Sequence, residues 1–378
     1  MRTDLSPPLP QPAAKPFPET TVSAASRPPV RGRGHRAASD FATLSAQVRA
    51  HGLLHRRRGA YARGIGALTL IAAAAVIATL LVGDRWWQLA VATLWGVLLS
   101  QFGFFAHDAA HRQVFRRPQA NEWASRLVST SVLGLSYGWW THKHNSHHRS
   151  PNQVGRDPDI APGGLVFTPE AAAERPRWLA PITRRQGYLF FPMLFLEGAN
   201  LHAAGIRTLA ERPDLPYRRL EAVLILARFA LPATALLAVM APVKVAAFML
   251  VQTAVFGFFL GAAFAPNHKG MPVLARDATV DFLRRQVLMS RNVRGGWLVD
   301  LAMGGLNYQI EHHLFPSMPR PNLRRAQPLV RAFCAERGIL YTETSLTASY
   351  ATVIAYLNDV GLSSRDPFSC PFVQAHRR

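Results

Sequence analysis

The chain has 378 residues, of which 49% are apolar and only 17% are charged. Its formal charge of +21 would suit nucleic acid or an anionic membrane, and long apolar runs favour the membrane and argue against a nucleic-acid partner. Two cysteines, Cys334 and Cys370, are too few for a disulfide framework and form no paired metal motif, which indicates a reducing compartment.

The N-terminal region is rich in Pro, Ala, Ser and Arg and shows no sustained apolar periodicity. We expect residues 1–45 to form a disordered basic tail. No apolar core follows Met1 closely enough for a cleaved signal peptide. The Arg56-Arg57-Arg58 cluster stands just before the first apolar run, so we interpret it as a juxtamembrane anchor for anionic lipid.

Four apolar runs are long enough to cross a bilayer as helices, which needs about 20 residues each. They cover residues 64–83, 86–106, 221–240 and 245–265 and pair into two hairpins with short polar tips. A fifth stretch, residues 187–206, contains Pro192, Glu197, Asn200 and His202, so we interpret it as an interfacial or re-entrant helix. Four crossings leave the basic residues outside the tips on one face, which the positive-inside bias makes cytoplasmic together with both termini.

Histidines gather in three short motifs. The first, His107-Asp108-Ala109-Ala110-His111, follows the second apolar run, and residues four apart on a continuing helix share a face. In the second motif His144, His147 and His148 have i, i+3, i+4 spacing, and the same spacing recurs in Gln309-Ile310-Glu311-His312-His313. His268 follows the fourth apolar run. Span parity places all of them on one side of the membrane.

Eight imidazoles are too many for one metal ion and suit two. The candidate ligands are His107, His111, His144, His147, His148, His268, His312 and His313. Imidazole binds zinc, copper, iron and nickel alike, so the residue type leaves the metal open. Ligating histidines usually donate their other ring N–H to a carboxylate or carbonyl, and Asp108, Asp157, Asp159 and Glu311 are near enough in sequence for that role.

The segments HDAAH, KHNSHH and QIEHHLFP resemble the three histidine boxes of the membrane fatty acid desaturases, from about residue 60 to 345. The glutamine that opens the third motif is similar to that of front-end desaturases and related bacterial, linoleoyl-CoA desaturase-like enzymes. We therefore expect an all-α integral membrane protein with four transmembrane helices in two hairpins and a cytoplasmic helical cap that carries a di-metal site. The desaturase domain would cover residues 46–350, with a C-terminal tail at 351–378, in a bacterial-type plasma membrane.

The resemblance implies two iron ions that use O2 to remove two hydrogens from a CoA- or lipid-linked acyl chain, leaving a cis double bond and water. It makes the eight histidines ligands and leaves ligation by Gln309 open, because many members have histidine there. His142 and Asn267 lie beside the motifs and are expected near the ligands. The chain shows no His-Pro-Gly-Gly haem motif of a fused cytochrome b5 domain, so electrons are expected from a ferredoxin or flavin reductase.

Three other functions fit parts of the pattern. A fatty acyl or lipid hydroxylase or ketolase could use the same di-iron centre. A zinc-dependent membrane hydrolase would need fewer histidines. A non-catalytic metal-binding or transport protein should carry polar residues within its spans, whereas these spans are apolar apart from Arg228.

Overall fold

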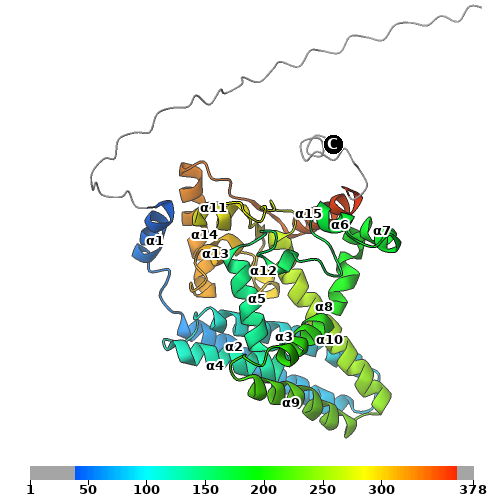
Figure 1. Cartoon of the computed structure of the whole chain (residues 1–378). Coiled ribbons are helices and arrows are strands. Elements are labelled where there is room, and N and C mark those ends of the chain that lie inside the picture. Colours follow the sequence, from blue (N-terminus) through cyan, green and yellow to red (C-terminus); the bar gives the residue numbers. More distant parts are fainter. Residues whose placement is uncertain (1–38, 364–378) are drawn as a thin grey trace, which may run out of the picture. The chain divides into compact units, whose positions relative to one another are not determined.

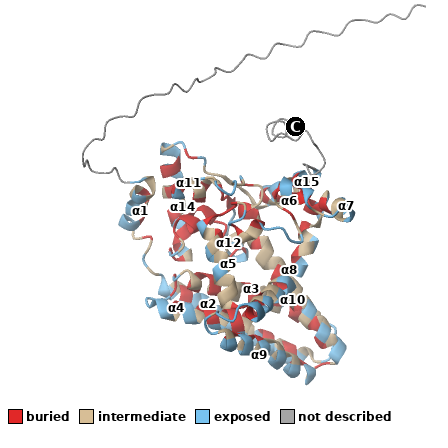
Figure 2. Ribbon diagram, in the orientation of Figure 1, coloured by how far each residue is buried: buried red, intermediate tan, exposed pale blue. Residues whose placement is uncertain are grey.

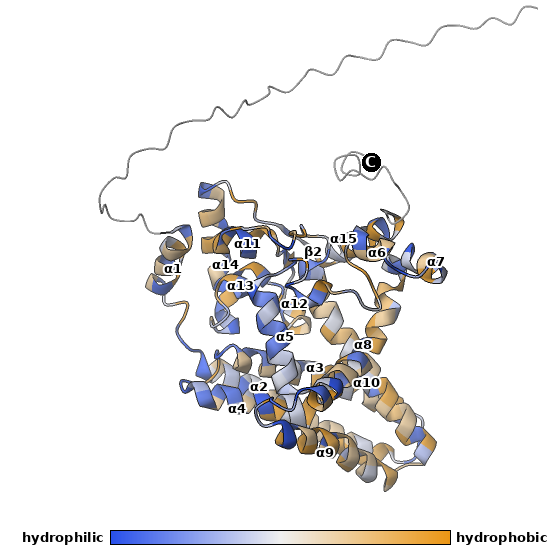
Figure 3. Ribbon diagram, viewed as in Figure 1, coloured by the Kyte–Doolittle hydropathy of each residue, from blue (hydrophilic) through white to orange (hydrophobic). Residues whose placement is uncertain are grey.

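The computed structural model describes residues 39–363, and nearly all of its regular structure is helical (Figure 1). Five helices in this range are long and apolar enough to cross a membrane. They are α2 (Arg58–Val82), α3 (Gln88–Ala110), α8 (Gln186–Glu211), α9 (Arg218–Leu237) and α10 (Pro242–His268). Figure 3 shows their apolar residues as orange ribbon in the lower part of the view. The four predicted apolar runs are therefore helices, and the stretch interpreted as interfacial is α8, whose composition also permits a crossing.

Glycines bring α10 into close contact with both α3 and α8. A Cβ atom added at Gly96 of α3 would lie 2.6 Å from the Cβ of Val255 on α10. A Cβ added at Gly257 of α10 would lie 2.1 Å from the backbone nitrogen of Gly198 on α8. Small residues at such points let helix backbones approach, which is how apolar helices pack without a hydrophobic driving force.

The tips of the two predicted hairpins lie together. Lys244, just after the start of α10, places Nζ 2.9 Å from Oδ1 of Asp84, which follows α2. The backbone N–H of Ala241 donates to the same carboxylate oxygen at 2.9 Å. The segments that follow α2 and α9 are thus joined by these contacts.

Most of the remaining described elements form a helical layer beside the histidine-bearing ends of α3 and α10. Its longer helices are α1 (Asp40–Ala50), α5 (Tyr137–Arg149), α14 (Arg320–Glu336) and α15 (Leu346–Ser363). Its shorter elements are η2 (Pro158–Ile160), α6 (Pro169–Ala173), η3 (Arg177–Leu179), α7 (Ala180–Thr183), α11 (Phe282–Leu288), α12 (Trp297–Ala302) and α13 (Gln309–Leu314). Two further helices, α4 (Pro118–Leu127) and η1 (Val128–Leu133), pack against α3, and η1 also packs against α9. Strands β1 (Asn292–Arg294) and β2 (Glu343–Ser345) pair in parallel.

This layer has an apolar core of its own, which Figure 2 shows as buried ribbon around α14. Val330 and Phe333 of α14 pack there with Ile310 and Leu314 of α13 and with Leu44 of α1. The short helix that carries the third histidine motif is therefore held by neighbours that lie elsewhere in the sequence.

Two helices run across the predicted domain boundaries. The predicted tail 1–45 ends inside α1, which Ser39 caps by accepting a hydrogen bond from the backbone of Ala42 and which buries Leu44 and Val48; residues 1–38 lie outside the described part. The predicted C-terminal tail begins inside α15, where Val353 and Leu357 are buried against α8. Both helices have weak hydrophobic periodicity, so the sequence does not mark them as clearly as it marks the long apolar runs.

Candidate metal centre

The three histidine motifs and His268 converge near the ends of α3 and α10. They form two groups, and within each group the ligand atoms lie within 4.8 Å of one another. The first group consists of His107, His111, His144, His148 and His312. The second consists of His147, His268 and His313. All eight histidines selected from the sequence therefore come together, although His107 and His313 are far apart along the chain.

Ring nitrogens in the first group point at one another. The Nε2 atoms of His111 and His144 are 2.8 Å apart, and those of His148 and His312 are 3.2 Å apart. Two imidazole nitrogens that bind one ion at about 2.1 Å and at right angles are about 3 Å apart. The convergence of several ring nitrogens on one point fits a shared cation.

The second group adjoins the first. The Nε2 atoms of His147 and His268 are 3.3 Å apart, and the ring of His313 lies 4.7 Å from that of His268. His313 also stacks on His148 of the first group, with ring centroids 4.2 Å apart. The two groups are therefore adjacent, and the ring nitrogens of each group converge on a separate point.

Helix geometry explains how single motifs serve both groups. On α5, His144 and His148 are four residues apart and face the first group, whereas His147 is turned to the second. On α13, the neighbours His312 and His313 are about 100° apart around the helix axis and divide in the same way. Each of these two motifs therefore contributes histidines to both groups.

Asp157 holds His147 from outside the centre. Its Oδ2 lies 3.0 Å from Nδ1 of His147 and also accepts the backbone N–H of Asn152 at 2.8 Å. Burial alone would lower the pKa of His147, but the carboxylates of Asp157 and Asp159 raise it above its ordinary value. The expected carboxylate partner of a ligating imidazole is therefore in place.

Two further rings are oriented by residues that sequence reasoning missed. Nδ1 of His268 lies 2.9 Å from the backbone oxygen of Met289, and Nδ1 of His313 lies 2.9 Å from Oε1 of Gln286. Both acceptors place the ring proton on Nδ1, which leaves Nε2 free to bind an ion. Neither acceptor belongs to a histidine motif, and no local pattern marks them.

Asp108 forms the corresponding link for His107. Its Oδ1 lies 3.4 Å from Nδ1 of His107, and its Oδ2 accepts a hydrogen bond of 2.7 Å from Nε of Arg320 on α14. Asp108 was expected from the sequence, whereas Arg320 was not. The pair connects α14 to the centre.

The remaining candidates differ in whether they lie beside one of the two histidine groups. Nε2 of Gln309 lies 2.9 Å from Nε2 of His268, and its Oε1 accepts from Asn267 at 3.3 Å, so both residues border the second group. His142 is exposed and belongs to neither group.

Glu311 was expected as a ring partner, but it has a different role. Its carboxylate accepts hydrogen bonds of 2.7 Å from Asn292 of β1 and 2.7 Å from the hydroxyl of Tyr341. Burial raises the pKa of Glu311 to about 7. Its side chain therefore anchors α13 to β1 and to the segment before β2 instead of orienting an imidazole.

The donor set fits a metal cofactor. Burial, followed by repulsion from neighbouring imidazoles, lowers the pKa of His144, His148, His312 and His313 well below the ordinary value, which favours the neutral form that metals bind. Nε2 of His107 and Nε2 of His313 are buried and have no hydrogen-bond partner among residues 39–363. Unpaired buried nitrogens of this kind are costly in a protein interior unless an ion binds them.

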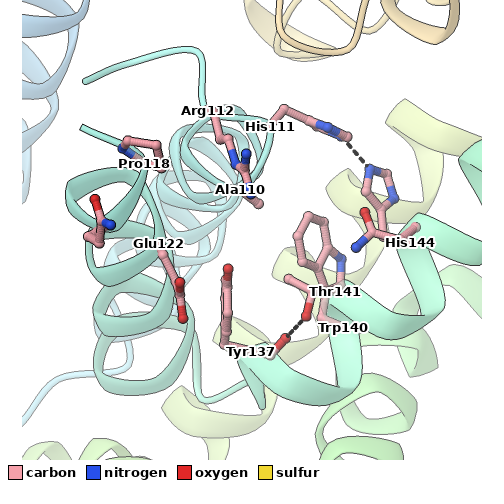
Figure 4. A pocket seen from close by; sticks show the side chains of 11 residues that line it. Ala110, His111, Arg112, Pro118, Glu122, Tyr137, Trp140, Thr141 and His144 are labelled. Carbon is pink, nitrogen blue, oxygen red and sulfur yellow. Dashed lines mark hydrogen bonds between the residues drawn. The ribbon is translucent and has the colours of Figure 1, made fainter. Parts of the chain in front are cut away.

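A cavity of about 430 Å³ opens beside the first group. Figure 4 shows His111 and His144 facing each other at one side, with Arg112, Glu122 and Trp140 among the surrounding residues. The indole of Trp140 stacks on His144 with ring centroids 4.6 Å apart. The stacking restricts the ring of His144, and both residues line the cavity.

A second, apolar cavity of about 40 Å³ touches His107. Trp140 also borders it, and Phe104, Leu260 and Phe264 contribute to its walls. Its volume is about a tenth of that of the polar cavity.

The fold and the site define a membrane protein with a histidine-rich candidate metal centre, and comparison with known proteins identifies its family. Residues 84–345 match the family model described as fatty acid desaturase. The chain is 32% identical over 282 residues to an acyl-lipid (9-3)-desaturase of Physcomitrium patens, covering 72% of this chain and 53% of that protein. This chain belongs to the fatty acid desaturase family.

Two further relatives are also named as desaturases. Identity is 31% over 325 residues with a delta(5) fatty acid desaturase of Caenorhabditis elegans, which covers 80% of this chain and 69% of that protein. It is 31% over 266 residues with an acyl-lipid 8-desaturase of Rebecca salina, which covers 67% of this chain and 60% of that protein. The match to these three relatives thus spans between about half and two thirds of their length.

Proposed function

We propose that this protein is an O2-dependent fatty acyl desaturase that introduces a cis double bond by means of a histidine-ligated di-iron centre. The observation that carries the proposal is the pair of adjoining histidine groups at the ends of apolar helices. The ligands of one iron would be the five histidines of the first group, and those of the other would be His147, His268 and His313, with Gln309 beside them. The iron pair, when bound, would activate O2, which is the oxidant that hydrogen removal from an unactivated methylene requires.

The chain's own residues hold the ligands and shape the space for the substrate. Asp157, Met289 and Gln286 fix the tautomers of three rings, so their Nε2 atoms stay directed inward. The apolar cavity at His107 marks where a methylene would meet the centre, and Trp140 separates it from the polar cavity. Apolar walls exclude water there, and they fix the position of the chain.

The names of the relatives guide the proposal for bond position. They are described as (9-3)-, delta(5)- and 8-desaturases. We place the new double bond on the carboxyl side of carbon 9 of a CoA- or lipid-linked acyl chain. Two electrons per turnover would come from a separate donor, such as a ferredoxin or a flavin reductase, attracted by the basic face of the protein.

The contact between Asp84 and Lys244 supports four crossings instead of five. α3 runs from this contact to His107, and α10 runs from it to His268, so the two helices end on the same side. If α8 crossed as well as α9, the start of α10 would lie on the side of the histidines. We therefore propose that α8 does not cross and that the metal centre and both termini are cytoplasmic.

The decisive experiment is expression in a host with a defined fatty acid profile, followed by mass-spectrometric location of new double bonds. A His312→Ala variant serves as the inactive control. New cis double bonds on the carboxyl side of carbon 9, absent from the control, are expected. Hydroxylated chains in place of double bonds would contradict the desaturase proposal, and purified protein that holds zinc without iron would contradict the di-iron centre.

A further inference from the structure

A third cavity, of about 920 Å³, is not used by the proposed reaction. Its walls come from the segment before α2, the first turns of α2, the loop after α3 and the start of α14. Five arginines line it: Arg56, Arg57, Arg58, Arg63 and Arg116. No acidic residue is among its lining residues. We call this cavity the arginine groove.

None of these five arginines has a charge partner among residues 39–363. Arg57 donates from Nε to Oδ1 of Asn322 at 2.9 Å, and Arg56 donates to the backbone oxygen of Arg112. For Arg58, Arg63 and Arg116, residues 39–363 offer neither an ion pair nor a side-chain hydrogen bond. Like charges that line one cavity repel one another, so a bound anion would relieve the repulsion.

The groove adjoins the start of α2 and the loop after α3, next to the ends of two apolar runs. Arg58 is the first residue of α2, and Arg63 is the last charged residue before the apolar run 64–83. Arg116 follows α3 by six positions in the numbering, near the end of that helix that carries His111. Headgroups begin where the hydrocarbon core ends, so the arginines of both helix ends meet the same interfacial layer.

We infer that the arginine groove binds the phosphate-bearing headgroup of an anionic membrane phospholipid. Guanidinium groups bind phosphate oxygens through paired N–H donors, and basic pockets beside transmembrane helices are suited to such headgroups. A soluble phosphate compound offers the same chemistry but lacks acyl chains to hold it at this depth.

A headgroup bound in the groove would affect the metal centre through contacts of α14. Asn322, which accepts from Arg57, donates from Nδ2 to the backbone oxygen of Leu53 at 2.7 Å. Arg320, two residues earlier, holds Asp108. A bound headgroup should therefore tighten the connection between α1, α2 and α14 and raise the melting temperature.

The test uses the full chain, purified in a neutral detergent and titrated with dioleoyl phosphatidylglycerol or dioleoyl phosphatidylcholine. Native mass spectrometry reads the bound lipid, and the melting temperature is a second readout. The groove variant is Arg58→Gln/Arg63→Gln/Arg116→Gln. The matched control, Arg177→Gln/Arg185→Gln/Arg219→Gln, removes the same charge at exposed positions outside the groove, including one at the start of α9.

We expect the parent chain and the control to bind phosphatidylglycerol more tightly than phosphatidylcholine. The groove variant should bind it roughly fivefold more weakly for each arginine removed. Equal affinity in the groove variant and the control would overturn the inference. So would binding of coenzyme A or inorganic pyrophosphate that displaces phosphatidylglycerol from the parent chain, because the site would then serve a soluble phosphate. None of these readouts depends on turnover, so the result is independent of the proposed desaturase activity.

Discussion

Arg320 and Asp108 form an ion pair that joins α14 to the last turn of α3, beside the first histidine group. Asp108 is only 2% exposed, and its second oxygen faces Nδ1 of His107. One carboxylate thus connects a helix of the cap, a helix of the membrane region and a candidate ligand. Its charge depends on Arg320 for compensation.

Replacement Arg320→Gln should therefore lower both stability and metal content. It leaves the buried carboxylate of Asp108 without its cation, at a cost of about 3 kcal/mol in the free energy of unfolding. The measurements are thermal unfolding in detergent and metal per chain by elemental analysis. Arg325→Gln, at an exposed position of the same helix, is the control and should leave both unchanged. Equal behaviour of the two variants would show that the ion pair does not support the centre.

Asp157→Asn should weaken metal binding without preventing folding. The amide keeps an acceptor for Nδ1 of His147 but loses the charge that makes the ring a better ligand, a change typically worth 10- to 100-fold in affinity. Competition with a graded chelator gives the affinity. Asp214→Asn, which removes an exposed carboxylate paired with Arg212, is expected to behave like the parent chain. An unchanged affinity in Asp157→Asn would remove this residue from the centre.

His142 and His148 lie on the same helix and offer a matched pair. His148→Ala should lose part of the bound metal, whereas His142→Ala should keep it, because only His148 belongs to a histidine group. Removing the metal from the parent chain with a chelator should lower its melting temperature. A bound ligand at a free concentration of 100 times its Kd stabilises the folded state by about 2.7 kcal/mol, and this contribution is lost when the metal is removed. Reloading with iron should restore the melting temperature of His142→Ala fully and that of His148→Ala in part. Full restoration of both would argue against the first group as a metal site.

Gly257→Ala should separate α8 from α10. The new methyl group would meet the backbone of Gly198 at 2.1 Å, and overpacking of this kind costs about 1–3 kcal/mol. Gly64→Ala, on α2, meets nothing within 4 Å and should be neutral or stabilising by about 0.5–1 kcal/mol. Melting temperatures in detergent test the difference. Metal content should fall with Gly257→Ala, because α10 also carries His268.

Most of the histidines of the centre could be predicted, because their spacing within each motif matches the periodicity of an α-helix. The spacing of His144, His147 and His148 predicts a shared helical face, and α5 confirms the helix. The division of that face between two groups was not predictable, because it depends on where α3 and α13 pack. Arg320, Gln286 and Met289 could not be found for the same reason: their contacts arise from tertiary packing, and no local spacing marks them.

The membrane region shows what amino-acid composition can predict about the spans and what it cannot. The four predicted spans are long helices, and two of them, α3 and α10, continue far enough to include His107 and His268. For α8 the sequence offered length and apolarity together with polar residues such as Glu197, so hydropathy alone cannot distinguish a crossing from a helix packed along the cap. The contact between Asp84 and Lys244 bears on this question, and it joins residues that no span prediction pairs.

The anchoring of Glu311 has a consequence for how the protein could be shortened or fused. The six residues of α13 are too few to form a stable helix alone, and Asn292 and Tyr341 grip the carboxylate in their middle. A chain that stopped soon after residue 318 would retain every histidine of both groups yet lack Tyr341 and α14, which keep two of them in place. Completeness of the ligand set in a sequence is therefore a poor guide to whether a fragment of this protein can bind metal.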